Sequence, residues 1–134
     1  MTVRPHRRPL ALLALATALA HGPCLWNEFV YDDDLLIRTN PTVQNPDLFV
    51  ACVVGPFFAN TVNEGTLVFF RPMVIASYFL TDRLCGDVAW PYHLTNVLIH
   101  LLNGWLVFHV VRAWMGLRRC GALVAALLFL VHPI

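Results

Sequence analysis

Several residue types and motifs that many enzymes need are missing from this chain of 134 residues. Lysine is absent, serine occurs only at Ser77, and no Gly-rich phosphate loop or H-E-x-x-H motif is present. The four cysteines show no C-x-x-C spacing. Serine hydrolases, Schiff-base enzymes, P-loop NTPases, zincins and zinc or disulfide frameworks therefore find no support. One bridge, between Cys52 and Cys85, stays open if this part of the chain is extracytoplasmic.

Charged residues are also scarce. They make up 13% of the chain, whereas apolar residues make up 58%, and the net charge is +1. This composition is far more apolar than that of a soluble domain, so we expect a lipid bilayer as the solvent. The basic residues are all arginines and are scattered along the sequence. Nucleic-acid binding is therefore not expected.

The first apolar segment has two interpretations. Three arginines, an apolar core and the small residues Ala18 and Ala20 fit a secretory signal peptide. Residues 10–29 are also long enough for a first transmembrane helix, kinked at Gly22 and Pro23, with Trp26 in the aromatic belt. Both interpretations place the N-terminus on the cytoplasmic side.

Residues 30–89 are expected to form a largely irregular external loop. Three Asn-Pro or Gly-Pro pairs interrupt its first part, so long regular elements are not expected there. Asp34 to Arg38 could form a short helical turn. A further helix is predicted to begin near Pro72, but its apolar run is too short to span a bilayer. We expect it to lie along the outer membrane surface.

Residues 91–114 predict a second transmembrane helix, and residues 120–134 begin a third. The fold class is therefore all-α, with two to three transmembrane segments in a polytopic membrane protein. All eight acidic residues lie between positions 28 and 87, and six arginines flank the other connections. The positive-inside rule then places the N-terminus in the cytoplasm and the acidic residues outside. The short last apolar run suggests the N-terminal piece of a larger helical membrane domain.

The second predicted span carries a polar stripe. Its residues recur at spacings of three and four and so share one helix face: His93, Asn96, His100 and Asn103. In hydrocarbon such a face should meet other helices or a watery cavity, because an unpaired amide facing lipid is costly. Contacts between helices and a binding role both remain open.

Three consecutive carboxylates, Asp32 to Asp34, follow the first apolar segment. Because like charges this close, beside low-dielectric lipid, disfavour full ionisation, we expect at least one of these carboxylates to bind its proton more tightly. Such a carboxylate can act as a general base or hold a divalent cation. A solvated acidic turn, or capping of the following turn, is the alternative.

The order of motifs resembles the multi-spanning O-mannosyltransferase-like proteins that carry tetratricopeptide repeats. The matching stretches cover nearly the whole chain after residue 25: Phe29-Val30-Tyr31-Asp32-Asp33, Asn40-Pro41, Phe70-Arg71-Pro72-Met73, Asp82-Arg83-Leu84, Tyr92-His93-Leu94-Thr95-Asn96 and Phe129-Leu130-Val131-His132-Pro133. The resemblance implies a C-type glycosyltransferase that moves a sugar, mannose, from a polyprenyl- or dolichyl-phosphate carrier to a protein hydroxyl. It also implies an uncleaved first helix in an endoplasmic reticulum or bacterial inner membrane.

By this resemblance, Asp32 and Asp33 are the catalytic or metal-binding acids, with Mg²⁺ or Mn²⁺ as the cation, while Asp34 lies outside the pair. Arg71 would contact the anionic lipid phosphate, as a guanidinium can do bidentately, or anchor a surface helix among headgroups. No repeat of about 34 residues is present in the chain itself.

His93 and His132 would line the site of the lipid-linked donor, or else serve in packing. A function of another class also remains. The chain would then be a non-catalytic membrane scaffold or assembly subunit whose polar face on residues 91–114 binds a partner helix.

Overall fold

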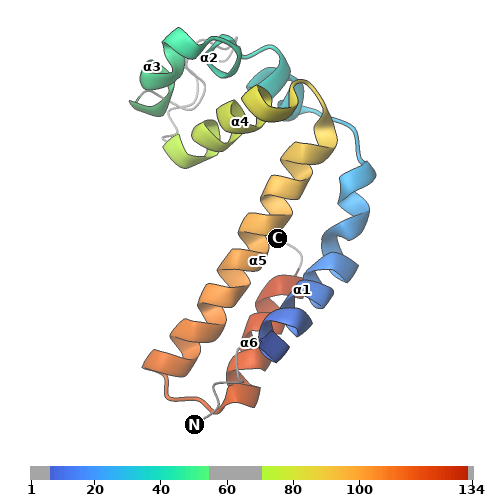
Figure 1. Ribbon diagram of the computed structural model, residues 1–134, viewed down its shortest axis with the longest axis vertical. Coiled ribbons are helices and arrows are strands. Elements are labelled where there is room, and N and C mark those ends of the chain that lie inside the picture. Colours follow the sequence, from blue (N-terminus) through green and yellow to red (C-terminus); the bar gives the residue numbers. More distant parts are fainter. Residues whose placement is uncertain (1–6, 55–70, 133–134) are drawn as a thin grey trace. The chain divides into compact units, whose positions relative to one another are not determined.

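The computed structural model describes residues 7–54 and 71–132, and every regular element in these two stretches is a helix. The all-α class is therefore confirmed for the described residues. The chain divides into two compact units (Figure 1). Unit 1 comprises Met1–Trp26 and Asn96–Ile134, and unit 2 comprises Asn27–Thr95.

Unit 1 is built from the first helix of the chain and the last two. The first, α1 (Arg7–His21), continues into the 3-10 helix η1 (Gly22–Trp26). The long helix α5 (Ala89–Trp114) supplies its residues from Asn96 onward, and α6 (Arg119–Val131) follows. Arg8–Trp26 and Ala89–Trp114, of 19 and 26 residues, are long and apolar enough to cross a membrane, whereas α6 is shorter. Two candidate spans and one short apolar helix match the predicted fold class.

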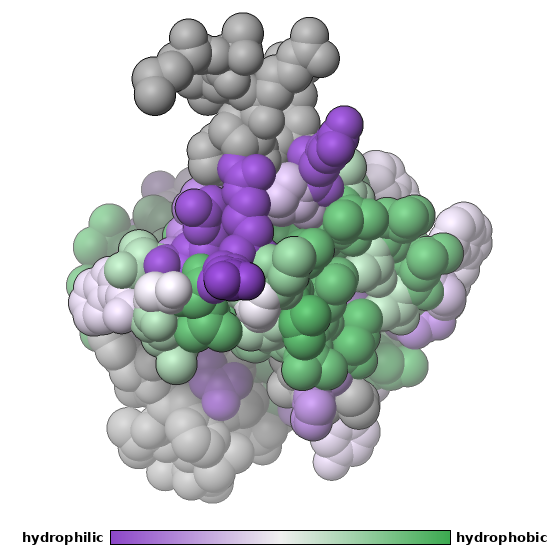
Figure 2. All heavy atoms as spheres, turned by 90° about the horizontal axis from the view of Figure 1, so that it is seen from below, coloured by the Kyte–Doolittle hydropathy of each residue, from purple (hydrophilic) through white to green (hydrophobic). Residues whose placement is uncertain are grey.

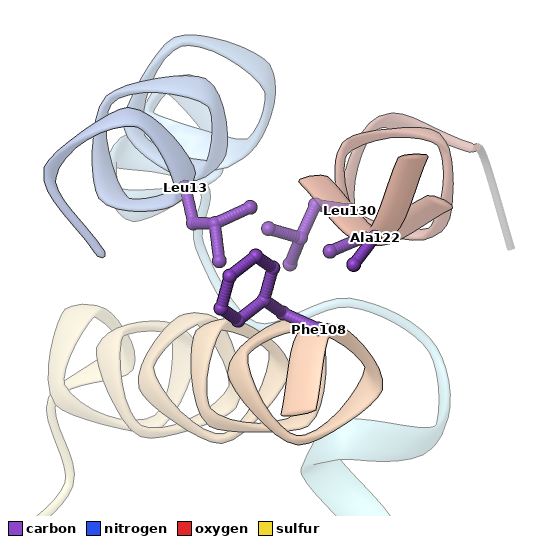
Figure 3. Close-up of a cluster of buried hydrophobic side chains, with 5 residues drawn as sticks. Leu13, Phe108, Ala122 and Leu130 are labelled. Atoms are coloured by element: carbon purple, nitrogen blue, oxygen red, sulfur yellow. The ribbon is translucent and has the colours of Figure 1, made fainter. Parts of the chain in front are cut away.

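The core of unit 1 joins its three helices (Figure 3). Phe108 of α5 points at Leu13 of α1 and Leu130 of α6, and all three side chains are fully buried. Ala122 and Ala126, one turn apart on α6, are buried in the same cluster. Such small residues let helices approach closely. At Gly104 a Cβ atom would lie 2.5 Å from Cδ2 of Leu130, so the close approach of α5 and α6 depends on glycine there.

Unit 2 begins with short helical elements: η2 (Asp34–Arg38), α2 (Pro41–Gln44), η3 (Pro46–Leu48) and α3 (Phe49–Val54). Each Asn-Pro pair starts one of them. Asn40 Oδ1 accepts a hydrogen bond from the Thr42 N–H (3.0 Å), and Asn45 Oδ1 accepts one from the Asp47 N–H (3.0 Å). The pairs thus limit element length, as expected, and also cap the next helix.

The helix α4 (Pro72–Cys85) begins at Pro72, as the sequence predicts, and Gly86, whose φ is +69°, caps its end. The predicted turn from Asp34 to Arg38 is confirmed as η2. Leu36 and Ile37 of η2, Ile75 of α4 and Tyr92 of α5 form the core of unit 2. Cys85 is a free cysteine, and the side chain of Cys52, its candidate partner, lies outside the described residues.

Candidate functional site

The acidic segment in unit 2 starts with a tight turn. Tyr31 adopts a φ of +52°, a left-handed conformation that L-residues rarely keep without support. That support comes from the residues on either side. The Asp33 N–H donates to Val30 O (3.1 Å), and the Val30 N–H donates to Asp33 Oδ2 (3.1 Å). The carboxylate of Asp33 is thereby held in one orientation, whereas Asp32 is exposed at the outside of the turn.

Asp34 has a different environment. Its Oδ1 accepts from Arg38 Nη1 (3.0 Å), and Arg38 Nε donates to Asp87 Oδ2 (3.0 Å). Hydrogen bonds to Asp87 and Asp34 raise the pKa of Arg38 above its ordinary value. The guanidinium therefore links η2 to the connection between α4 and α5. The sequence left the role of Asp34 open, and the structure places it in this ion pair.

Breaking this link should loosen η2. We expect an Arg38→Gln variant to show faster amide hydrogen exchange at residues 34–38, because the bonds to both carboxylates are lost. The difference from the unsubstituted chain should shrink at high salt, since all three side chains are about half exposed. Asp47→Asn, which removes an exposed charge from η3, is the matched control. Equal exchange in Arg38→Gln and the unsubstituted chain would contradict this role.

The start of α5 makes a second contact with the segment. His93 Nε2 lies 3.1 Å from Asn27 O, and the ring of Phe29 meets that of Tyr92 edge-on at 5.3 Å. Tyr78 of α4 stands beside Tyr92, with ring centroids 6.2 Å apart. Asn27 and Phe29, which precede the acids, thus contact the start of α5. These contacts place the acidic turn next to α4 and α5.

The pKa of Tyr78 depends on the charged residues of this region. Burial raises the pKa of its phenol, the negative charge of Asp33 raises it further, and the positive charge of Arg71 lowers it. Asp33 and Arg71 therefore both act on Tyr78 through space. Four of the predicted site residues, Asp32, Asp33, Arg71 and His93, thus lie in unit 2.

Tyr78 predicts a pH dependence. Because its folded-state pKa lies above the unfolded value of about 10, the unfolded chain loses this proton first, and stability falls as the pH rises past that value. Below it the phenol is neutral in both states and contributes no pH dependence. An absorbance titration of the phenolate should place the Tyr78 pKa above the ordinary value and lower in Asp33→Asn, yet still raised, because burial is the larger cause. An unchanged titration in Asp33→Asn would contradict the proximity of the two groups.

His132 follows α6 in unit 1 and is exposed. The acidic turn belongs to unit 2. Among the described residues, no three carboxylate, imidazole or thiol groups gather as a metal site. Asp32 and Asp33 offer two carboxylates, which suits a Mg²⁺ ion that completes its shell with water and substrate phosphate. Binding of a metal ion by these two carboxylates therefore requires further ligands from a substrate.

Arg38, Asp87 and Tyr78 were not predicted as parts of this region. The spacing of four between Asp34 and Arg38 is typical of a helical ion pair and could have indicated the first contact. No sequence signal points to Asp87, which lies 49 positions from Arg38.

The histidines and the asparagines of the polar stripe on α5 have different surroundings. The two imidazoles have partners within the chain: His93 contacts Asn27 O, and His100 Nε2 lies 3.2 Å from Leu130 O. His21 Nε2 lies 2.7 Å from the same carbonyl, so the ends of α1 and α6 and the middle of α5 meet there. The amides of Asn96 and Asn103 are exposed.

These features define a helical chain whose two long apolar helices are consistent with an integral membrane protein and whose acidic turn adjoins the start of one of them. Its sequence is similar to those of proteins named protein O-mannosyl-transferase. It is 33% identical over 97% of its length to protein O-mannosyl-transferase TMTC1 of Mus musculus and 35% identical over 99% to Tmtc1 of Drosophila melanogaster. The human TMTC1 is 32% identical over 92% of the chain.

The chain spans only about 15% of the length of these relatives, with 15%, 16% and 14% of the three proteins covered. No protein-family model and no solved structure matches it. The sequence relationship therefore supports the predicted resemblance to O-mannosyltransferases. The tetratricopeptide repeats and the site residues stay predictions.

Proposed function

We propose that these residues form part of a membrane glycosyltransferase that moves mannose from a polyprenyl- or dolichyl-phosphate carrier to a protein hydroxyl. The observation that carries the proposal is the acidic turn, with Asp33 held in one orientation beside α4 and α5, in a chain whose relatives are named protein O-mannosyl-transferases. The lipid-linked sugar, the acceptor protein and the bilayer are its partners. Because these relatives come from animals, the endoplasmic reticulum is the membrane we favour.

In this proposal residues 10–29 and 91–114 cross the membrane, residues 30–89 lie on the outer side, and residues 120–134 begin a third span. The N-terminus is cytoplasmic. The arginines that flank the spans and the confinement of all acidic residues to unit 2 support this orientation. The acidic turn then faces the compartment in which the acceptor hydroxyl would arrive.

The carboxylate of Asp32 or Asp33 would take the proton of the acceptor hydroxyl as its oxygen bonds to the anomeric carbon of the sugar. The bond from that carbon to the carrier phosphate would break, and the polyprenyl or dolichyl phosphate would leave. A carboxylate with a fixed orientation suits this role, since proton transfer needs hydrogen-bond geometry, and the bond from the Val30 N–H supplies it for Asp33. The same pair would hold Mg²⁺ or Mn²⁺ where substrate phosphates complete the shell, and the ion would then offset phosphate charge.

Arg71 would bind the carrier phosphate through its guanidinium. Its support is electrostatic, because Arg71 and Asp33 act on the same phenol of Tyr78. His93 would border the donor site from the start of α5, next to the backbone of Asn27. The proposed role of His132 rests on the family resemblance alone.

A transfer assay tests the function. The full polypeptide that carries these residues is incubated in detergent with dolichyl-phosphate-mannose and an acceptor protein, and mannose bound to the acceptor is measured. We expect mannosylated acceptor, with chelation by EDTA showing whether a divalent ion takes part. No transfer by folded protein, under conditions in which a known mannosyltransferase is active, would contradict the proposal.

A second function is favoured by the exposed amides. Asn96 and Asn103 are seven residues apart, which places them on one face of α5 two turns from each other. Ile99 lies three residues after Asn96, and Leu106 lies three residues after Asn103. Both are exposed, and this spacing of three and four is the heptad pattern of a helix–helix contact. A scaffold that binds a partner helix on this face predicts that Asn96→Leu with Asn103→Leu abolishes partner capture, whereas neutralising Asp32 and Asp33 leaves it intact. The enzyme predicts a loss of transfer in the Asp variants.

A further inference from the structure

The charges of the chain are divided sharply between the two units. Unit 1 contains six of the nine arginines and no acidic residue, whereas unit 2 contains three arginines and all eight acidic residues. The ion pairs of the described residues involve Arg38 and Arg83, both in unit 2. The arginines of unit 1 therefore have no carboxylate within their own unit to neutralise them.

The fold of unit 1 brings together the helix ends that carry four of these arginines. Within this unit α1 and α6 run in one direction and α5 runs in the other, so the start of α1, the end of α5 and the start of α6 meet at one end (Figure 1). Four arginines lie at these helix ends, and we call them the arginine end: Arg8, Arg112, Arg118 and Arg119. Three are exposed and Arg112 is partly exposed.

Apolar and aromatic groups accompany the charges. Trp114 is 86% exposed and Met115 is 68% exposed, and both stand where α5 ends, beside the arginines. Figure 2, which views the chain from that end, shows hydrophilic side chains next to a broad apolar surface. Arginines and a tryptophan at the ends of apolar helices are typical of a membrane–water interface. In unit 1 no acidic side chain accompanies these arginines.

We propose that the arginine end of unit 1 binds the phosphate groups of anionic lipid headgroups. A guanidinium forms paired, charge-assisted hydrogen bonds with phosphate oxygens. Headgroup phosphates lie at the depth where arginines that end apolar helices emerge. An anionic leaflet attracts each such side chain by an amount equivalent to about fivefold in affinity. The proposal rests on the membrane placement and not on sugar transfer.

Lipid selectivity in vesicles tests this inference. The 134-residue chain is reconstituted in phosphatidylcholine vesicles, and spin-labelled phosphatidylserine is compared with spin-labelled phosphatidylcholine by electron paramagnetic resonance. We expect the serine lipid to be enriched severalfold at the protein surface at low salt. The enrichment should fall toward one in 1 M NaCl, because screening weakens exposed charge pairs. Equal association of the two lipids at low salt would overturn the proposal.

Variants locate the site. Arg118→Gln with Arg119→Gln should remove most of the enrichment, whereas Arg118→Lys with Arg119→Lys should retain much of it because the charge remains. Arg38→Gln, which removes a positive charge from unit 2, is the control and should leave the selectivity unchanged. Circular dichroism checks that each variant keeps its helices. An equal loss in Arg38→Gln and the Gln pair would show that total charge, and not this end, sets the selectivity, and would overturn the proposal.

Competition with inorganic phosphate distinguishes a site for lipid headgroup phosphate from a site for free phosphate. If inorganic phosphate abolishes the enrichment while sodium chloride of the same ionic strength does not, the arginine end is a site for free phosphate, and the lipid assignment is overturned. Equal effects of the two salts support binding to the lipid surface. Because none of these measurements uses sugar transfer, a failed transfer assay leaves the inference standing, and the reverse also holds.

Discussion

Replacing Asp33 or Asp32 with asparagine is expected to lower the rate of sugar transfer by roughly 10²–10⁴-fold, the usual contribution of a general base. Asparagine keeps the shape and can still accept the Val30 N–H at position 33, but it cannot take a proton. The loss should appear in kcat rather than in KM, since the base acts only as the hydroxyl attacks. Initial rates at several acceptor concentrations measure this difference.

The third acid of the run is the matched control. Asp34→Asn also removes one charge from the same stretch, but Asp34 pairs with Arg38, and Arg38 keeps its bond to Asp87 in the variant. We therefore expect a much smaller loss of transfer. Unchanged turnover in both Asp33→Asn and Asp32→Asn would rule out the assignment. An equal loss in all three variants would show that the run acts only through its total charge.

Introducing a large side chain at Gly104 is expected to disrupt the packing of α5 against α6. A Cβ atom there would lie 2.5 Å from Cδ2 and Cγ of Leu130, and Leu130 is fully buried among Leu13 and Phe108. A Gly104→Leu variant should lose about 1–3 kcal/mol of stability, which is the usual cost of overpacking. Unfolding in mixed micelles of increasing denaturing detergent measures this loss.

A compensating change tests the cause. Combining Gly104→Leu with Leu130→Ala removes the side chain that the new leucine would meet, so part of the stability should return. Gly22→Ala is the control, because a Cβ at Gly22 meets nothing within 4 Å. A Gly104→Leu variant as stable as Gly22→Ala would contradict the close approach of the two helices.

Local signals in the sequence were sufficient for most helices. Pro72 predicts the start of α4, because proline suits the first turn of a helix, and α4 begins there. The long apolar run predicts α5, and the turn from Asp34 to Arg38 was also predicted. These features depend on residues a few positions apart, whose influence on the backbone does not require the rest of the fold.

The candidate site was predicted only in part. The acidic run is visible in the sequence, but three adjacent carboxylates look equivalent there. Their hydrogen bonds distinguish them: Asp33 with the Val30 N–H, Asp34 with Arg38, and Asp32 exposed. The partners of His93 and His100 are 66 and 30 positions away, and no local pattern carries such pairings.

The sequence by itself determined that this chain is helical and suited to a bilayer, because composition and the length of apolar runs set the preferred solvent and local backbone. It also confined every carboxylate to one continuous stretch. Only the tertiary structure decided which charges meet. Arginines that look scattered, at position 8 and at positions 112 to 119, come together because α1 and α6 run opposite to α5, and Asp87 reaches Arg38 because α4 returns the chain to η2.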